Sequence, residues 1–370
     1  MIKSLVVKGL WGRYDYDLQF NEDINIFTGS NGTGKTTLLK TLWYLYSGHF
    51  NQLVKEIYFK EAIITAKNDR KLVIRRNEIV VQNEDVVPSK TLITMALIDN
   101  KGKTYLSFES TIKGKEPEEN PDNAIEGAVD GSIFFPTFRR LEGGFSLQES
   151  SDLINALRDF TSQMTKDQHR FISSSDSQDI RGLINEISSD IRIKMESANA
   201  DFMNFLTKNV KGSVSPHFTE ELKKKIEQKE KAETEAKEPI TNLSKYIDQY
   251  FWEKSIKITD DLKLGRNTNE ISVENLSAGE KNFLSFLVYA SSLKKGIIFI
   301  DEPELNLHID WQRLLLSTLH HISPKVQFFV ATHSPAIYAS YPDKSFWFDE
   351  IVRQSSDGLP TEVVQESVLG

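Results

Sequence analysis

The chain of 370 residues contains no cysteine, which excludes disulfide bonds, thiolate metal sites and cysteine nucleophiles. This absence also fits a reducing compartment. The sequence lacks any run of the roughly 18 apolar residues that a membrane-spanning helix needs, and its N-terminal apolar stretch is too short for a signal peptide. We therefore expect a soluble, cytoplasmic protein with no membrane partner.

An excess of positive charge is also missing, because the formal net charge is −8 and the sequence pI is about 5.5. Nucleic-acid binding usually requires a basic surface, since each phosphate contact needs Lys or Arg. Local basic clusters do occur, at Lys71, Arg75 and Arg76 and at Arg139 and Arg140. We expect these clusters to be solvated surface, and a local contact with DNA is the alternative.

The composition changes along the chain and predicts an α/β protein with an insertion. Apolar runs typical of strands and helices occupy residues 1–146 and return in residues 266–370, which predicts an N-terminal and a C-terminal lobe. Residues 147–265 are dominated by helix formers. Within them, Glu220–Glu238 interleaves Glu and Lys, which is typical of an exposed helix of about five turns. We expect this inserted helical region to be a short arm that binds a partner.

The clearest motif is Gly29-Ser-Asn-Gly-Thr-Gly-Lys35-Thr36, a complete G-x-x-x-x-G-K-[ST] pattern. It follows an apolar run and precedes residues with helical spacing. Glycines at these positions let backbone N–H groups surround phosphates, and the N-terminus of the following helix favours the same anion. The motif predicts ATP binding, with Lys35 on the β- and γ-phosphates and the Thr36 hydroxyl as a Mg²⁺ ligand.

A second motif is the apolar run Gly296–Ile300, which ends in the two carboxylates Asp301 and Glu302. A carboxylate at the tip of a buried strand suits Mg²⁺ coordination in a protein that carries a phosphate-binding loop. The neighbouring carboxylate is placed to orient or deprotonate a water. We therefore predict Asp301 as a second metal ligand and Glu302 as a catalytic residue.

Three further segments resemble the motifs of ABC-type ATPases. Leu276-Ser-Ala-Gly-Glu280 resembles the family signature, which usually has Gly where Ala278 stands and often Gln where Glu280 stands. Asp301-Glu302-Pro303-Glu304, followed by Leu305–His308, is similar to the family's Walker B motif and D-loop, and Ala331-Thr-His333-Ser-Pro335 is similar to its switch-histidine motif. The resemblance implies an ABC-type P-loop ATPase head, which has a mixed sheet with flanking helices and an antiparallel β subdomain.

The resemblance also implies roles for individual residues. Glu302 would be the general base and His333 would sense the γ-phosphate. In this family two subunits dimerise head to tail, and the signature of one completes the ATP site of the other, which implies a homodimer or a higher homo-oligomer. The nucleotide-binding set it implies comprises Gly29, Asn31, Gly32, Gly34, Lys35, Thr36, Thr37, Ser277, Gly279 and Arg13. Gln148 and Gln82 are alternative candidates for the Q-loop glutamine.

The size of the insertion narrows the resemblance to the RecF-like and OLD-like groups, because the long heptad arrays of SMC-like proteins are missing. Residues Ser334–Gly370 are too few for the Toprim domain of OLD nucleases, so we expect any nuclease to be a separate chain. The segment FFPTFRRLEGG resembles stand-alone ATPases of bacterial anti-phage systems, PARIS-like or Septu-like.

Three functions follow from these observations. The resemblance implies a Mg²⁺-dependent ATPase switch that controls an effector, a Toprim or HNH nuclease, in response to a phage protein. The alternative is a RecF-like repair ATPase that clamps DNA. A protein that binds ATP without hydrolysing it is disfavoured by Asp301, Glu302 and His333 together.

Overall fold

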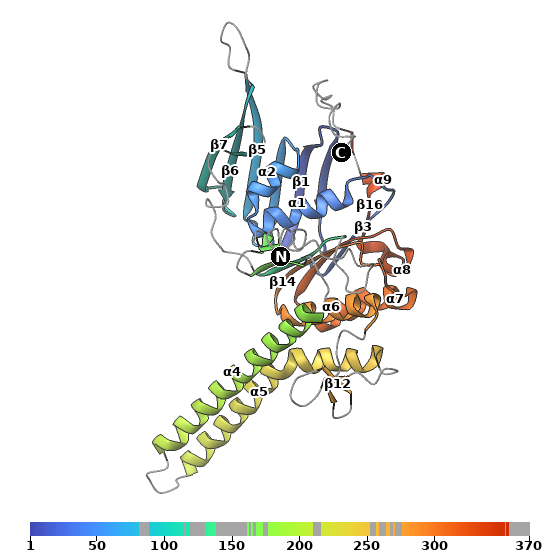
Figure 1. The fold of residues 1–370 in the computed structure, drawn as a ribbon. Helices are drawn as coiled ribbons and strands as arrows, with labels where there is room; N and C mark the ends of the chain where they lie inside the picture. The colour runs from blue at the N-terminus through green and yellow to red at the C-terminus, as the bar shows by residue number, and fades with distance from the viewer. Residues whose placement is uncertain are drawn as a thin grey trace.

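The computed structural model shows two large sheets, a layer of helices between them and a long helical hairpin (Figure 1). It describes residues 1–80, 89–113, 116–117, 130–137, 161–162, 164–165, 168–172, 177–209, 216–251, 257–258, 264–266, 269–270, 276–351 and 353–354.

The central sheet has six strands, all parallel, in the order β10-β9-β14-β15-β3-β16. Its strands are β3 (Ile24–Thr28), β9 (Ser132–Phe135), β10 (His169–Phe171), β14 (Gly296–Asp301), β15 (Val326–Ala331) and β16 (Ser345–Trp347). Most of these strands are buried on both faces, which is why they read as continuous apolar runs. Because they are parallel, the residues that follow each strand meet at one edge of the sheet.

The second sheet has eight strands and is antiparallel. It contains β1 (Ile2–Leu10), β2 (Tyr14–Gln19), β4 (Glu61–Ala66), β5 (Lys71–Val80), β6 (Ser89–Ile98), β7 (Thr104–Lys113), β8 (Glu116–Pro117) and β17 (Arg353–Gln354). Helices α1 (Lys35–Ser47) and α2 (Phe50–Glu56) fill the space between the two sheets. Their apolar side chains form one core with Phe299 and Phe329 of the central sheet.

The opposite face of the central sheet is covered by α6 (Ala278–Ser292) and α7 (Ile309–Ile322). Alternate residues of one strand therefore enter different cores: Phe299 faces α1, whereas Ile298 and Ile300 pack with the helices of the other face. Smaller elements complete the described chain, namely α8 (Pro335–Tyr338), η4 (Pro342–Lys344), α9 (Phe348–Ile351) and the sheet of β11 (Lys257–Ile258), β12 (Leu264–Arg266) and β13 (Asn269–Glu270).

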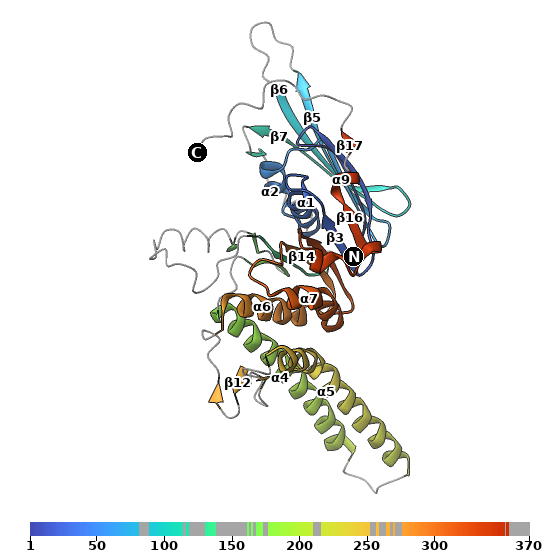
Figure 2. The same cartoon turned by 90° about the vertical axis from the view of Figure 1, so that its right-hand side faces the viewer.

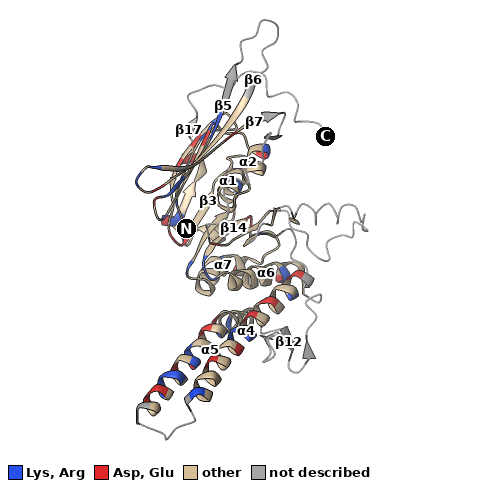
Figure 3. Ribbon diagram, turned by 90° about the vertical axis from the view of Figure 1, so that its left-hand side faces the viewer, with Lys and Arg blue, Asp and Glu red and all other residues tan. Residues whose placement is uncertain are grey.

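The helical hairpin consists of α4 (Ser177–Asn209) and α5 (Pro216–Tyr250), with 33 and 35 residues. It leaves the head on the side opposite the antiparallel sheet (Figure 2). The expectation of a short arm of about five turns is wrong, because α5 alone makes roughly ten turns. The Glu/Lys run is its exposed part, where charges of both signs alternate along the hairpin (Figure 3) and Lys229 pairs with Glu233.

The hairpin is longer than its charge pattern indicates. Helix α5 continues past the Glu/Lys run into a base that is held by apolar packing. Ile240, Leu243 and Ile247 of α5 recur at helical spacing and are buried with Ile184 and Ile187 of α4. This core also contains residues of α6 and α7, so the arm is built directly onto these two helices.

The expected α/β architecture, with flanking helices, an antiparallel β subdomain and an inserted helical arm, is confirmed, and its parallel and antiparallel strands lie in separate sheets instead of one mixed sheet. The domain limits at residues 147 and 265 remain a prediction. Strand β10 lies within that range and pairs with β9 of the head. Among the described residues, no helix is long and apolar enough to cross a membrane.

Candidate functional site

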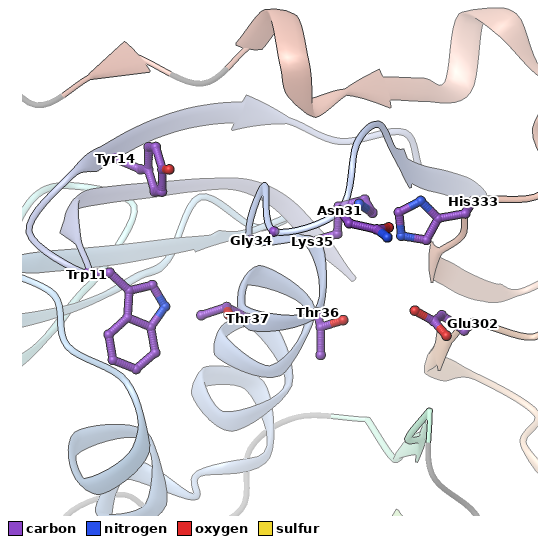
Figure 4. A pocket seen from close by; sticks show the side chains of 10 residues that line it. Trp11, Tyr14, Asn31, Gly34, Lys35, Thr36, Thr37, Glu302 and His333 are labelled. Carbon is purple, nitrogen blue, oxygen red and sulfur yellow. The ribbon is translucent and has the colours of Figure 1, made fainter. Parts of the chain in front are cut away.

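The loop between β3 and α1 forms one wall of a pocket of about 400 Å³ (Figure 4). The pocket is lined by Trp11, Tyr14, Asn31, Gly32, Gly34, Lys35, Thr36, Thr37, Glu302 and His333. Gly34 precedes the helix with φ of 89°, a left-handed conformation that favours glycine. The loop is also held from outside, because the Tyr16 hydroxyl donates to the Thr33 carbonyl at 2.9 Å.

Lys35 folds back onto its own loop. Its Nζ donates to the carbonyl oxygens of Ser30 at 2.7 Å and Gly29 at 3.1 Å. Burial lowers the pKa of Lys35, and nearby carboxylates, Asp349 foremost, oppose that shift. An anion in the pocket would offer the ammonium group a stronger partner than these carbonyls.

Asp301, at the tip of β14, hydrogen-bonds to residues that follow two other strands of the central sheet, β3 and β9. It is buried, and its Oδ1 accepts a hydrogen bond from the Thr36 hydroxyl at 3.0 Å. Its Oδ2 accepts from the hydroxyl of Thr137, which lies two residues beyond β9. Thr137 carries no local sequence signal, and only the pairing of β9 with β14 brings it to this site.

The donor set around Asp301 fits Mg²⁺. A buried carboxylate and a hydroxyl within hydrogen-bond distance are hard oxygen ligands, and Mg²⁺ usually takes one or two such protein ligands together with phosphates and water. In the described part of the chain, no three His, Cys, Asp or Glu side chains gather into a metal site of their own. Thr36 and Asp301 would therefore hold the ion together with a nucleotide.

Glu302 has a strained backbone conformation. Its φ is 47°, which is unusual for a residue other than glycine, and its N–H donates to the Ala331 carbonyl at 2.8 Å. Burial raises the pKa of Glu302, and the negative charges of Asp301 and Glu304 add to the effect. The side chain faces the pocket from the side opposite the phosphate-binding loop.

His333, after β15, is held through its backbone. Its N–H donates to Glu304 Oε1 at 2.8 Å, and the Thr332 hydroxyl donates to Oε2 of the same carboxylate at 2.9 Å. Gln312 of α7 adds a second connection between these segments, because its Nε2 donates to the Leu307 carbonyl and its Oε1 accepts from the Ser334 hydroxyl. The D-loop and the histidine loop are therefore one hydrogen-bonded unit.

The signature segment lies outside the pocket lining. Ser277 is exposed and caps α6 in a capping box: its hydroxyl accepts from the Glu280 N–H, and its own N–H and hydroxyl donate to the Glu280 carboxylate. Gly279 packs so closely on the D-loop that an added Cβ would lie 2.2 Å from the Asn306 carbonyl oxygen. The structure therefore requires glycine at 279.

The pocket gathers most of the predicted nucleotide-binding residues from one chain, but not all of them. Gly29, Ser277, Gly279 and Arg13 are not part of its lining. At the β1–β2 turn, Trp11 and Tyr14 line the pocket instead of Arg13, which is exposed. The role of Arg13 stays a prediction, and Gln82, Gln148, Arg139 and Arg140 lie outside the described residues.

The first basic cluster lies at the surface in part, because Lys71 and Arg75 are exposed and Arg76 is half-buried. Arg75 Nε donates to Glu61 Oε1 at 2.6 Å, and Lys8 approaches the other oxygen of the same carboxylate. Arg76 donates to the Val54 carbonyl and lies over the rings of Tyr58 and Phe59. These two arginines are engaged within the head.

The chain is similar to several known proteins. The chain is 22% identical over 352 residues to the Septu protein PtuA of Bacillus thuringiensis, which covers 90% of this chain and 72% of that protein. It is 34% identical over 90 residues to the Retron Vc95 probable ATPase of Vibrio cholerae serotype O1 biovar El Tor, which covers 21% of this chain and 18% of that protein. The SMC head bound to the C-winged helix domain of ScpA aligns over 91% of each chain with a TM-score of 0.40 and 13% identity. The family model for the AAA ATPase domain matches residues 1–338. The chain therefore belongs to the AAA ATPase domain family.

Proposed function

We propose that this chain binds and hydrolyses ATP with Mg²⁺ and acts as the switch subunit of an anti-phage system. The observation that carries the proposal is the convergence of the phosphate-binding loop, Asp301, Glu302 and His333 on one pocket and its edge. The Thr36 hydroxyl lies 3.0 Å from Asp301 Oδ1, and Glu302 and His333 line the same pocket as Lys35. This is the set of groups that phosphoryl transfer to water requires.

Each group would act on a different part of the nucleotide. Lys35 leaves the Ser30 carbonyl and places its charge on the β- and γ-phosphates, while the N–H groups of the loop surround them. Glu302 orients the attacking water and accepts its proton, and His333 contacts the γ-phosphate. When bound by Thr36 and Asp301, Mg²⁺ would neutralise charge on the phosphates.

The adenine ring of the nucleotide would lie at the end of the pocket away from Glu302 and His333. Trp11 and Tyr14 face this end from the β1–β2 turn, as Figure 4 shows, and Trp11 is 44% exposed. Aromatic faces stack on nucleobases with little preference among them. The two rings therefore support a nucleoside triphosphate as the ligand and leave the discrimination of adenine to other contacts.

Replacing Lys35 with alanine tests the proposal. We expect the affinity for a fluorescent ATP analogue to fall about a hundredfold, because the variant loses charge-assisted hydrogen bonds to two phosphates. The matched control is Lys40→Ala on the same helix, whose ammonium lies 3.9 Å from Glu56 and does not line the pocket. An affinity for the Lys35→Ala protein within threefold of wild type would refute the assignment.

The relatives support the defence role. The Septu protein PtuA aligns with most of this chain, and two retron ATPases match a shorter part. Within the proposal, the partners are a separately encoded effector, a Toprim or HNH nuclease, and a phage protein as trigger, in a cytoplasmic setting. A RecF-like clamp on DNA is the weaker alternative, because the formal net charge is −8 and phosphate contacts require a basic surface.

The arm is the proposed partner-binding element. Its base shares a core with α6, and α6 begins at the signature. A movement of the arm would therefore be transmitted through side-chain packing to the residues around the D-loop. The D-loop in turn is bonded to α6, because Asn282 Nδ2 donates to the Leu305 carbonyl at 3.2 Å. The position of the arm would thus differ between the nucleotide-bound and nucleotide-free states, and a partner protein that prefers one position would distinguish the two states.

Truncating the arm tests this part. Residues 198–231 are replaced by a short Gly/Ser linker, which leaves in place the buried residues Ile191 and Ala236 and the partly buried Met195, which packs against the same core as Ile191. We expect basal ATP hydrolysis within about threefold of wild type, because the pocket and the packed base stay intact, and loss of phage protection in cells that carry the native neighbouring genes. A truncated protein that is folded by circular dichroism but does not hydrolyse ATP would place the arm in the catalytic machinery.

A further inference from the structure

The segment that follows β15 returns to the phosphate-binding loop from outside. Strand β16 is the edge strand next to β3, with Trp347 opposite Thr28, so the next residues lie at the edge of the sheet where that loop begins. The segment is anchored by Phe348, which is buried and packs 5.2 Å from Phe27 and 5.5 Å from Tyr16, measured between ring centroids. It then pairs with β2 through β17.

Asp349 contacts the loop directly. Its Oδ2 accepts a hydrogen bond from the Ser30 N–H at 2.9 Å. The approach depends on Gly29, since a Cβ added there would lie 2.8 Å from the same carboxylate oxygen and φ at this glycine is 132°. The hydrogen bond lowers the pKa of Asp349, because it favours the charged form of the carboxylate.

Both backbone polar groups of Ser30, which belong to adjacent peptide units, are hydrogen-bonded. Its carbonyl accepts from Lys35 Nζ at 2.7 Å and from the Thr33 hydroxyl at 2.9 Å, while its N–H is bound by Asp349. When Lys35 turns toward phosphates, the carbonyl loses its charged donor. The hydrogen bond from Ser30 N–H to Asp349 does not involve Lys35 and persists through that movement. Asp349 is not part of the pocket lining, and its charge acts on Lys35 through space.

We propose that Asp349 is a positioning residue for nucleotide binding, which fixes the backbone N–H of Ser30 in the phosphate-binding loop while Lys35 transfers its hydrogen bonds from the loop carbonyls to the nucleotide. The proposal rests on the proposed function, because it assumes that the pocket takes ATP. It assigns a site role to a residue more than 300 positions away from the loop it supports.

Titration with a fluorescent ATP analogue in the presence of Mg²⁺ tests the proposal. We expect Asp349→Ala to raise Kd about tenfold, because a hydrogen bond to a charged group is lost, and to leave kcat at saturation within about threefold. Asp349→Asn keeps an oxygen acceptor of the same reach and should stay within about threefold of wild type. Glu350→Ala removes the neighbouring exposed carboxylate of α9 and should change Kd less than twofold.

Two further measurements separate positioning from general stability. Saturating nucleotide should raise the Tm of Asp349→Ala less than that of wild type, whereas a residue that only stabilises the fold would lower the Tm of both states equally. Hydrogen exchange on the wild-type protein needs no variant: the Ser30 amide should stay protected with and without nucleotide. Rapid exchange with nucleotide bound, or an Asp349→Ala Kd within twofold of wild type, would overturn the proposal. Failure of wild type itself to bind the analogue would instead refute the proposed function.

Discussion

Replacing Glu302 with glutamine should leave ATP binding within a few fold of wild type and lower the rate of hydrolysis at least a hundredfold, since general base catalysis typically contributes factors of 10² to 10⁴. Glutamine keeps the size of the side chain and can still hold a water, but it cannot accept the proton. The raised pKa of Glu302 makes its carboxylate a better proton acceptor than an ordinary exposed glutamate. The strained backbone at this residue also supports a functional role, because residues other than glycine with a positive φ, here 47°, cluster at active sites.

Single-turnover hydrolysis of radiolabelled ATP measures the effect, because it separates the chemical step from product release. The matched control is Glu350→Gln, an exposed carboxylate outside the pocket, which should hydrolyse ATP at the wild-type rate. The Glu302→Gln protein should also accumulate as an ATP-bound dimer in size-exclusion chromatography. A single-turnover rate equal to that of wild type would place the base at another residue.

The candidate residues for phosphate chemistry can be predicted from the sequence because their motifs are local. The phosphate-binding loop and the pair Asp301–Glu302 each follow a buried strand, so a short stretch of sequence contains both the element and the site at its end. The order of the strands then brings the sites together, since β15 alone separates β3 from β14. In the structure, Lys35, Glu302 and His333 line one pocket.

Residues that support the site from a distance gave no such signal. Asp349 reaches Ser30 and Thr137 reaches Asp301 only because of strand pairings between segments far apart in the chain. The length of the arm was underestimated for a different reason. The Glu/Lys run was conspicuous, whereas the apolar positions Ile240, Leu243 and Ile247 that continue the same helix depend on a neighbour for their burial.

The signature shows a limit of reasoning from motifs. The N-terminus of α6 favours an anion, but the Glu280 carboxylate already occupies that end through the capping box. A γ-phosphate supplied by another subunit would have to displace Glu280 from Ser277, and the two negative charges would repel each other. Closure of a dimer on this surface would therefore cost more than it does with a neutral residue at 280.

If the signature of one chain completes the ATP site of the other, two inactive variants should restore ATPase activity when they are mixed. Lys35→Ala removes the phosphate contact of one pocket, and Ser277→Arg places a bulky cation on an exposed residue that does not line its own pocket. In a head-to-tail heterodimer of the two, one site carries both changes and the other carries neither. An equal mixture should regain up to about a quarter of the wild-type ATPase activity, because half of the dimers are mixed and each has one intact site.

The matched control for this rescue is a mixture of Lys35→Ala with Glu302→Gln. Lys35 and Glu302 line one pocket within a single chain, so each subunit of that heterodimer has a damaged pocket and no site is intact. Activity in the Lys35/Ser277 mixture but not in the Lys35/Glu302 mixture would show that the signature acts across the dimer and the base within the chain. If heterodimers form and neither mixture hydrolyses ATP, Ser277 acts only as the cap of α6, and the two-subunit site is wrong.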